Sequence, residues 1–109
     1  MAEESLHLEC TPRRFDVVPG EPIRLELVVR SDSAAAIRWH VPEETLLKLR
    51  AVEKVPVQRS SDGYIVNKRV VIWQALEPGR VRIDGVLVET KGRKLRFPEV
   101  TIAVREPSS

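Results

Sequence analysis

The residues best suited to nucleophilic or metal chemistry in this chain are one cysteine and two histidines, Cys10, His7 and His40. A nucleophilic cysteine needs a nearby base and a lowered thiol pKa. His7 precedes Cys10 by three residues, and in an extended strand this spacing puts the two side chains on opposite faces. Neither a Cys-x-x-Cys nor a His-x-x-x-His spacing, which would support a zinc site, is present. We therefore expect an inert thiol, no bound metal and no cofactor.

Carboxylates are numerous, but their spacing matches no known reactive site. Glu43 and Glu44 are adjacent, and Asp62 follows two serines in a turn, where neighbouring acids could hold calcium. An Asp-x-Asp-x-Asp-Gly loop is absent from the sequence, as are glycine-rich phosphate loops and Gly-x-Ser-x-Gly. A pocket that gathers His40 with Glu43 or Glu44 would be needed to indicate an enzyme. The sequence predicts a protein without catalytic residues.

Charges of both signs alternate along the chain. Eighteen Lys and Arg stand against 16 Asp and Glu, for a formal net charge of +2. No block of like charges occurs, and the few aromatic side chains could not form a stacking platform, so nucleic-acid binding is not indicated. The most basic segment, Lys91-Gly92-Arg93-Lys94, is expected to be a solvated hairpin tip, where an anion or an acidic partner could bind.

The length of 109 residues fits one domain with a single core. One cysteine excludes an internal disulfide, and 42% hydrophobic residues exclude a wholly disordered chain. No apolar run approaches the ~18 residues that cross a bilayer. The segment 1–5 lacks the basic flank and apolar stretch of a secretion signal. We expect one domain over 1–109, ordered from about 6 to 104, with 105–109 as a frayed tail.

Apolar residues recur with a period of two, which predicts strands. The clearest strand is 23–30, where Ile23, Leu25, Leu27 and Val29 share one face. Turns that contain Pro or Gly separate it from its neighbours. The other expected strands are an edge strand over 6–18 that is broken near Thr11-Pro12, then 36–41, 45–52, 55–58, 64–76, 80–90 and 95–104.

Two stretches allow more than one interpretation. Residues 45–52 fit either two helical turns or a strand in which Leu47, Leu49 and Ala51 point inward. We favour the strand, because the neighbouring segments are all strands. Residues 70–73 are apolar on both faces, which indicates either a strand covered on both sides or a bulge that switches the pattern.

Seven to nine short, mainly antiparallel strands with little or no helix predict an all-β protein, an immunoglobulin-like β-sandwich. Trp39 lies on the strand after 23–29, where a tryptophan fills the space between the sheets of such sandwiches. We expect Trp39 to be buried there, and Trp73 to be mostly buried as well.

Several segments resemble the immunoglobulin-like modules of the BatD type, which are associated with bacterial oxygen-tolerance operons. The segments are 17–23, 74–79, 81–83, 85–88, 91–94 and 98–104. They total 31 of the 109 residues and lie in both halves of the chain. Asp84-Gly85 stands where the family has a proline, which is a departure from the pattern. The resemblance implies an immunoglobulin-like fold in a cell-envelope protein that acts by protein–protein contact, with no catalytic residues to carry over.

The leading hypothesis is a non-catalytic interaction or structural module, one domain of a bacterial cell-envelope protein with a protein partner. It would act by surface complementarity or by strand addition at an exposed edge, with 6–10 and 55–58 as candidate edges. The alternative is a carbohydrate-binding sandwich, which needs Tyr64 and Trp73 exposed together. An excised domain would be periplasmic or envelope-bound, whereas a chain that begins naturally at Met1 would be cytoplasmic.

Overall fold

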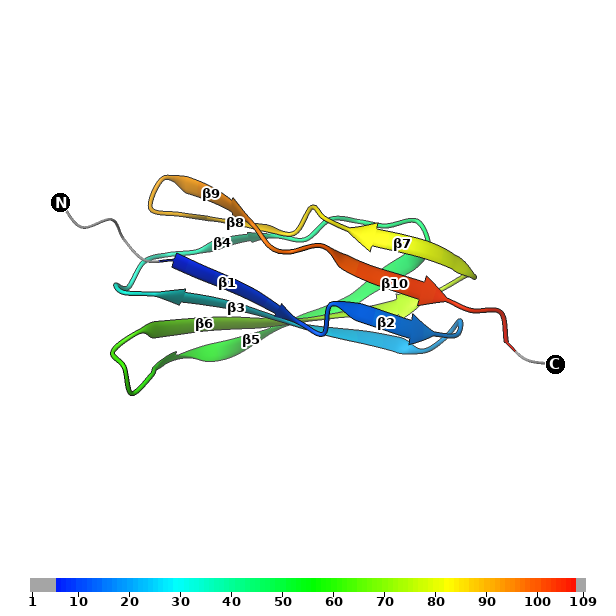
Figure 1. Cartoon of the computed structure of the whole chain (residues 1–109), viewed down its shortest axis with the longest axis horizontal. Helices are drawn as coiled ribbons and strands as arrows, with labels where there is room; N and C mark the ends of the chain where they lie inside the picture. The colour runs from blue at the N-terminus through cyan, green and yellow to red at the C-terminus, as the bar shows by residue number, and fades with distance from the viewer. Residues whose placement is uncertain (1–5, 108–109) are drawn as a thin grey trace.

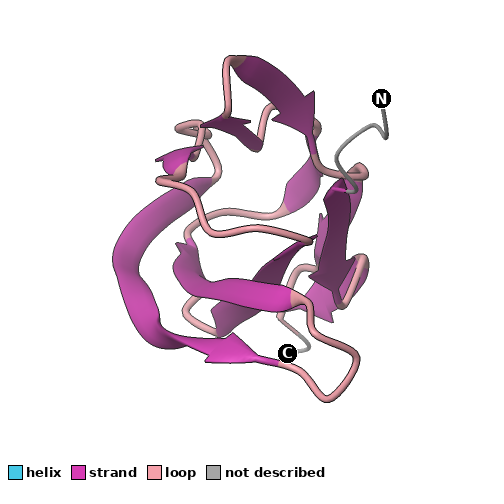
Figure 2. Ribbon diagram, turned by 90° about the vertical axis from the view of Figure 1, so that its left-hand side faces the viewer, coloured by secondary structure: helices cyan, strands magenta, loops and turns pink. Residues whose placement is uncertain are grey.

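The computed structural model describes residues 6–107, and over that range it contains strands and no helix (Figures 1 and 2). The all-β prediction is confirmed. No described segment is a helix of the kind that crosses a membrane. In chain order the strands are β1 (Leu6–Thr11), β2 (Arg14–Val17), β3 (Pro22–Ser31), β4 (Arg38–His40), β5 (Leu47–Arg59), β6 (Ile65–Ala75), β7 (Gly79–Ile83), β8 (Leu87–Thr90), β9 (Arg93–Arg96) and β10 (Val100–Val104).

The strands form two layers along an elongated molecule of 59 × 23 × 18 Å. One layer is a four-stranded sheet in the order β1-β3-β6-β5. The other layer consists of the sheets β4-β8-β9 and β2-β10-β7, which lie over opposite halves of the first (Figure 1). There are ten strands in place of seven to nine, because the chain breaks at 84–86 and again at 97–99. The two breaks lie side by side, since the Phe97 N–H donates to the Val86 carbonyl at 2.9 Å.

The first expected strand divides between the two layers. β1 pairs with β3 in antiparallel fashion, whereas β2 pairs with β10 in parallel, the one parallel pair among the described strands. Pro12 lies at the division, and a proline has no N–H to continue a ladder. The single edge strand expected over 6–18 is therefore wrong in its second half, which belongs to the opposite sheet.

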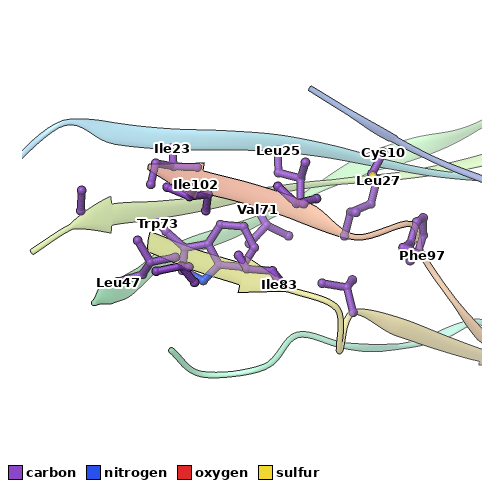
Figure 3. Close-up of a cluster of buried hydrophobic side chains, with 14 of the residues drawn as sticks. Cys10, Ile23, Leu25, Leu27, Leu47, Val71, Trp73, Ile83, Phe97 and Ile102 are labelled. Carbon is purple, nitrogen blue, oxygen red and sulfur yellow. The ribbon is translucent and has the colours of Figure 1, made fainter. Parts of the chain in front are cut away.

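The core lies between the layers and is built by the period-two pattern of the sequence (Figure 3). The four inward residues of β3, from Ile23 to Val29, have no exposed surface. Trp73 on β6 is only 1% exposed, as expected. Trp39 is only half-buried, because β4 is three residues long and forms the edge of its sheet. Its ring stacks on Phe97 at the margin of the core, with centroids 6.0 Å apart.

β5 is one long strand, so the preference for a strand over 45–52 is confirmed, whereas a separate strand over 55–58 is wrong. The register against β6 is irregular between Leu49 and Ala51 and again between Val55 and Gln58. The first irregularity turns Ala51 to the outer face, opposite Ile72, where the sequence had placed it inward. β6 keeps its alternation against β3 without a register shift. Val70 lies on the outer face of β6 and is buried between its cross-strand neighbours, Glu26 and Glu53.

The end of the described chain is held to β2. The Arg105 N–H donates to the Val17 carbonyl at 2.7 Å, and the Arg105 guanidinium pairs with Asp16. Arg105, which the sequence placed in a frayed tail, is therefore held to the sheet. The expectations for segments 1–5 and 108–109 lie outside the described residues.

We expect Gly79→Ala to lower the free energy of unfolding by about 1–3 kcal/mol, as measured by urea denaturation. Gly79 has φ of +152°, and a Cβ there would lie 2.5 Å from Leu46 Cδ1. Gly85→Ala is the matched control, because its Cβ would lie at an ordinary 3.6 Å from Pro42 and its φ is not in the left-handed region. Equal losses in the two variants would contradict this account.

Candidate functional site

Cys10 lies on the inward face of β1, where its thiol donates to the Pro98 carbonyl oxygen at 3.6 Å. His7 lies on the exposed face of the same strand, with its ring 6.2 Å from that of Tyr64. The structure therefore separates the two side chains as their spacing predicts. Burial raises the pKa of the Cys10 thiol, and the opposing charge of Arg13 is the smaller effect. A thiol that stays protonated is a poor nucleophile.

We expect the native Cys10 thiol to react with Ellman's reagent at least ~10-fold more slowly than glutathione at the same pH. The physical reason is its burial together with its raised pKa. In denaturing urea the rate should rise to that of the free thiol, which serves as the control. A native rate equal to that of glutathione would show that the thiol is accessible.

The pocket that would have indicated an enzyme is not formed by His40 and the two glutamates. His40 Nε2 lies 3.7 Å from Glu89 Oε2, whereas Glu43 and Glu44 line a separate cleft beside Trp73. No constellation of nucleophile and base therefore arises from the candidates that the sequence offered.

An ion cluster around Glu89 was missed by the sequence analysis. The Glu89 carboxylate lies 3.4 Å from Lys94 Nζ and 3.8 Å from an Arg38 nitrogen. The hydrogen bond from Lys94 is the largest of the effects that lower the pKa of the Glu89 carboxyl. Arg38, Glu89 and Lys94 come from β4, β8 and β9, so only the pairing of these strands brings them together.

Asp62 shapes the turn between β5 and β6. Its carboxylate accepts hydrogen bonds from the Ser60 hydroxyl and from the Tyr64 N–H, and these bonds lower its pKa. Within residues 6–107 no three His, Cys, Asp or Glu side chains gather as a metal site.

The basic hairpin tip is a tight turn whose charges are largely matched within the molecule. Lys91 has φ of 53° and Gly92 has φ of 74°, the two positive values that a type I′ turn requires. The Lys91 ammonium contacts the Ser33 hydroxyl and lies 3.8 Å from Asp32. Lys94 pairs with Glu89, so the tip does not concentrate free positive charge as an anion site would require.

Tyr64 and Trp73 do not form an aromatic platform. Trp73 is enclosed between the layers, and Tyr64 is half-buried before the first residue of β6. The exposed pair that a carbohydrate-binding module would need is absent from these positions.

The exposed large apolar side chains of the described chain lie on β5 and just after β6. They are Leu49, Val52, Val57 and Leu76, with Leu49 39% and Val52 44% exposed. β5 and β1 are the two edges of the four-stranded sheet, which places both candidate edges of the sequence analysis at sheet edges. Leu49 and Val52 pair with Trp73 and Val71, so they point to the core side of the sheet. They stay exposed because the second layer does not cover β5, whose main contacts are with β6.

A cleft of about 300 Å³ opens at the first residues of β5. Its walls are Glu43, Glu44, Leu47, Lys48, Leu49, Trp73 and Leu76. The indole Nε1 of Trp73 is buried without a hydrogen-bond partner, and Figure 3 shows it on the Leu47 side of the ring. Four of its seven wall residues are apolar and three are charged. We call this cleft together with Leu49, Val52 and Leu76 the β5 surface.

The β5 strand itself is strongly basic. It carries four cations, Lys48, Arg50, Lys54 and Arg59, against the single acid Glu53. Glu53 is paired with Arg24 at 3.4 Å, and Arg50 donates to the Gln74 side-chain oxygen at 2.8 Å. Within 6–107 none of the four cations forms an ion pair with a carboxylate, and Glu43 and Glu44 are the acids that share the cleft with Lys48.

Comparison with known proteins bears on the fold. No family model matches the chain, and a search of curated proteins gives no match. Among solved structures, the BIgI domain of beta protein from S. agalactiae bound to CEACAM1 is similar, with a TM-score of 0.60 at 12% sequence identity. The alignment covers 95% of this chain and 100% of that domain. The chain therefore has the immunoglobulin-like β-sandwich fold.

Proposed function

We propose that this chain is a non-catalytic protein-interaction module that binds its partner through the β5 surface. The observation that carries the proposal is the exposed apolar side of β5, because contiguous apolar surface on a folded domain marks interaction sites. A bacterial domain of the same fold is described bound to a protein, CEACAM1, which supports this use of the fold. The candidate catalytic groups Cys10, His40 and Glu43 lie apart, which favours binding over catalysis.

The cellular setting of the proposal comes from the resemblance to BatD-type modules. That resemblance supports a place in a bacterial cell-envelope protein, where such modules act by protein–protein contact. Most of the segments that carry it lie on β7 to β10 in the second layer, whereas 74–79 contains Leu76 of the β5 surface.

Photo-crosslinking in the source cells tests the proposal. A benzophenone side chain in place of Leu49 should capture a partner, whereas the same group in place of Asp84, which is exposed on the second layer, should not. With the captured protein purified, Val52→Glu should weaken binding at least ~10-fold, because it puts a charge into the apolar part of the interface. Arg80→Glu, an exposed change on β7, is the matched control. Identical capture from both positions would contradict the β5 surface as the site.

A further inference from the structure

The free edge of β5 indicates how a partner would bind and which types of side chain the partner would present. Resting on the proposed function, we infer that the partner adds an extended, acid-rich strand to β5. The features that carry this inference are unpaired backbone groups at Leu49, Val52 and Lys54, cations on the same strand without a paired carboxylate, and the neighbouring cleft. Main-chain bonds give affinity in strand addition, and the side chains of alternate residues give specificity.

The direction of the backbone groups follows from the hydrogen bonds at the end of β6. The Leu76 N–H donates to the Leu46 carbonyl at 2.9 Å, and the Ala75 N–H donates to the Glu21 carbonyl at 3.1 Å. In antiparallel pairing successive residues alternate between the two neighbours. Even-numbered β6 residues therefore bond to β5 and odd-numbered ones bond to β3.

Between Lys48 and Val55, this alternation leaves three β5 residues with backbone groups that face away from β6. Leu49 and Val52 are paired with Trp73 and Val71, and Lys54 is paired with Arg69, all odd-numbered β6 residues. Those β6 residues use their N–H and C=O groups toward β3. The N–H and C=O groups of Leu49, Val52 and Lys54 are therefore the row that an added strand would meet.

The same edge limits where the strand can lie. Pro56 has no N–H, and the register shift between Val55 and Gln58 breaks the regular edge there. Such features protect an edge from unwanted pairing. The other register shift, between Leu49 and Ala51, interrupts the edge as well. The regular row therefore runs from Val52 to Lys54, and Leu49 lies beyond the irregularity, beside the cleft.

The charged and apolar side chains of the β5 edge indicate which residues an added strand would carry. Lys48 is paired with Gln74 on the outer face, and Arg50 reaches that same glutamine, so both cations lie on the outer side of the edge. Leu49, Val52 and Lys54 lie on the inner side, and the outer Glu53 is already paired with Arg24. A complementary strand therefore places acidic residues opposite Lys48 and Arg50 on the outer side and apolar residues opposite Leu49 and Val52 on the inner side, one of which can enter the cleft. A second copy of β5 would instead place its own four cations and one acid beside the four cations and one acid of the first copy. The like charges of the two strands would repel each other.

The probe is a blocked nonapeptide that alternates Glu and Val, titrated into ¹⁵N-labelled protein, with a Lys-for-Glu peptide as its control. We expect chemical-shift changes confined to β5 and its neighbours and slower hydrogen exchange of the Leu49, Val52 and Lys54 amides. The Lys peptide should bind at least ~10-fold more weakly, because it meets like charges. No shifts with either peptide, or equal affinity for the two, would overturn the inference.

Variants at the edge separate backbone pairing from side-chain contact. Val52→Pro removes an outward N–H and no ladder bond, so it should stay folded and lose at least ~10-fold in affinity for the Glu peptide. Val52→Thr keeps the N–H and should retain binding. Arg50→Glu should weaken binding and Arg80→Glu should not, and this pair of variants tests the inference if the proline variant does not fold. Affinity of the folded Val52→Pro protein equal to that of wild type would refute strand addition.

Two further outcomes distinguish this inference from the proposed function. A partner captured at Leu49 that still binds Val52→Pro would leave the proposed function standing and rule out strand addition. A concentration-dependent dimer in sedimentation that Val52→Pro dissolves would make a second copy the occupant, against the acidic strand.

Discussion

Trp73→Ala should lower the free energy of unfolding by about 3–5 kcal/mol, the range for removing a large aromatic from a core. Natural domains have about 5–15 kcal/mol in total, so the variant should be close to unfolding. Trp73 is only 1% exposed between the layers, with Leu47 and Val71 in the same buried cluster. Urea denaturation followed by circular dichroism measures the loss without depending on the tryptophan fluorescence that the change removes.

Two matched variants define the origin of that loss. Trp73→Phe keeps much of the apolar volume and removes the unpaired indole N–H, so it should cost clearly less than alanine. Trp39→Ala removes a ring that is only half-buried at the margin of the core and should also cost less. If Trp39→Ala lowered the free energy of unfolding as much as Trp73→Ala, the placement of Trp73 at the centre of the core and of Trp39 at its margin would be contradicted.

Leu25→Ala and Leu49→Ala should differ strongly, although both leucines point to the core side of the four-stranded sheet. Leu25 has no exposed surface, and its loss should cost about 2–5 kcal/mol. Leu49 is 39% exposed, and its loss should cost less than about 1 kcal/mol. The same urea measurement serves both variants.

This comparison also tests the premise of the β5 surface. If Leu49→Ala were as costly as Leu25→Ala, the chain itself would cover β5 in solution. The surface would then be part of the core, and neither the protein-interaction site nor strand addition could be placed there.

The sequence was sufficient for the fold class because one face of most strands is buried. The pattern of β3 is unambiguous, since Ile23, Leu25 and Leu27 alternate with exposed or half-buried residues. The assignment of β1 and β2 to different sheets could not be predicted from the sequence. Pro12 indicates that a strand ends, but it does not indicate which sheet the next strand joins. The continuity of β5 through Pro56 was missed for the related reason that an edge strand tolerates a proline that a central strand would not.

Only part of the candidate site could be predicted from the residues. The edges at 6–10 and 55–58 were marked by their prolines, and both lie on edge strands. Leu49 was predicted to point inward, which it does, but alternation says nothing about whether the opposite layer reaches far enough to cover it. The cleft beside Trp73 depends on the path of the segment between β4 and β5, and that path has no signature in the sequence.

The parallel pairing of β2 with β10 has a mechanical consequence. β1 begins toward one end of the long axis and β10 ends toward the other, so a pull on the start of β1 and the end of β10 stretches the molecule lengthwise (Figure 1). The pull would slide β2 and β10 past each other and load all of their hydrogen bonds at once, where an unzipping geometry would break them one by one. Because Val17 on β2 and Ile102 on β10 also belong to the core, sliding these strands apart would require breaking core contacts as well as the ladder.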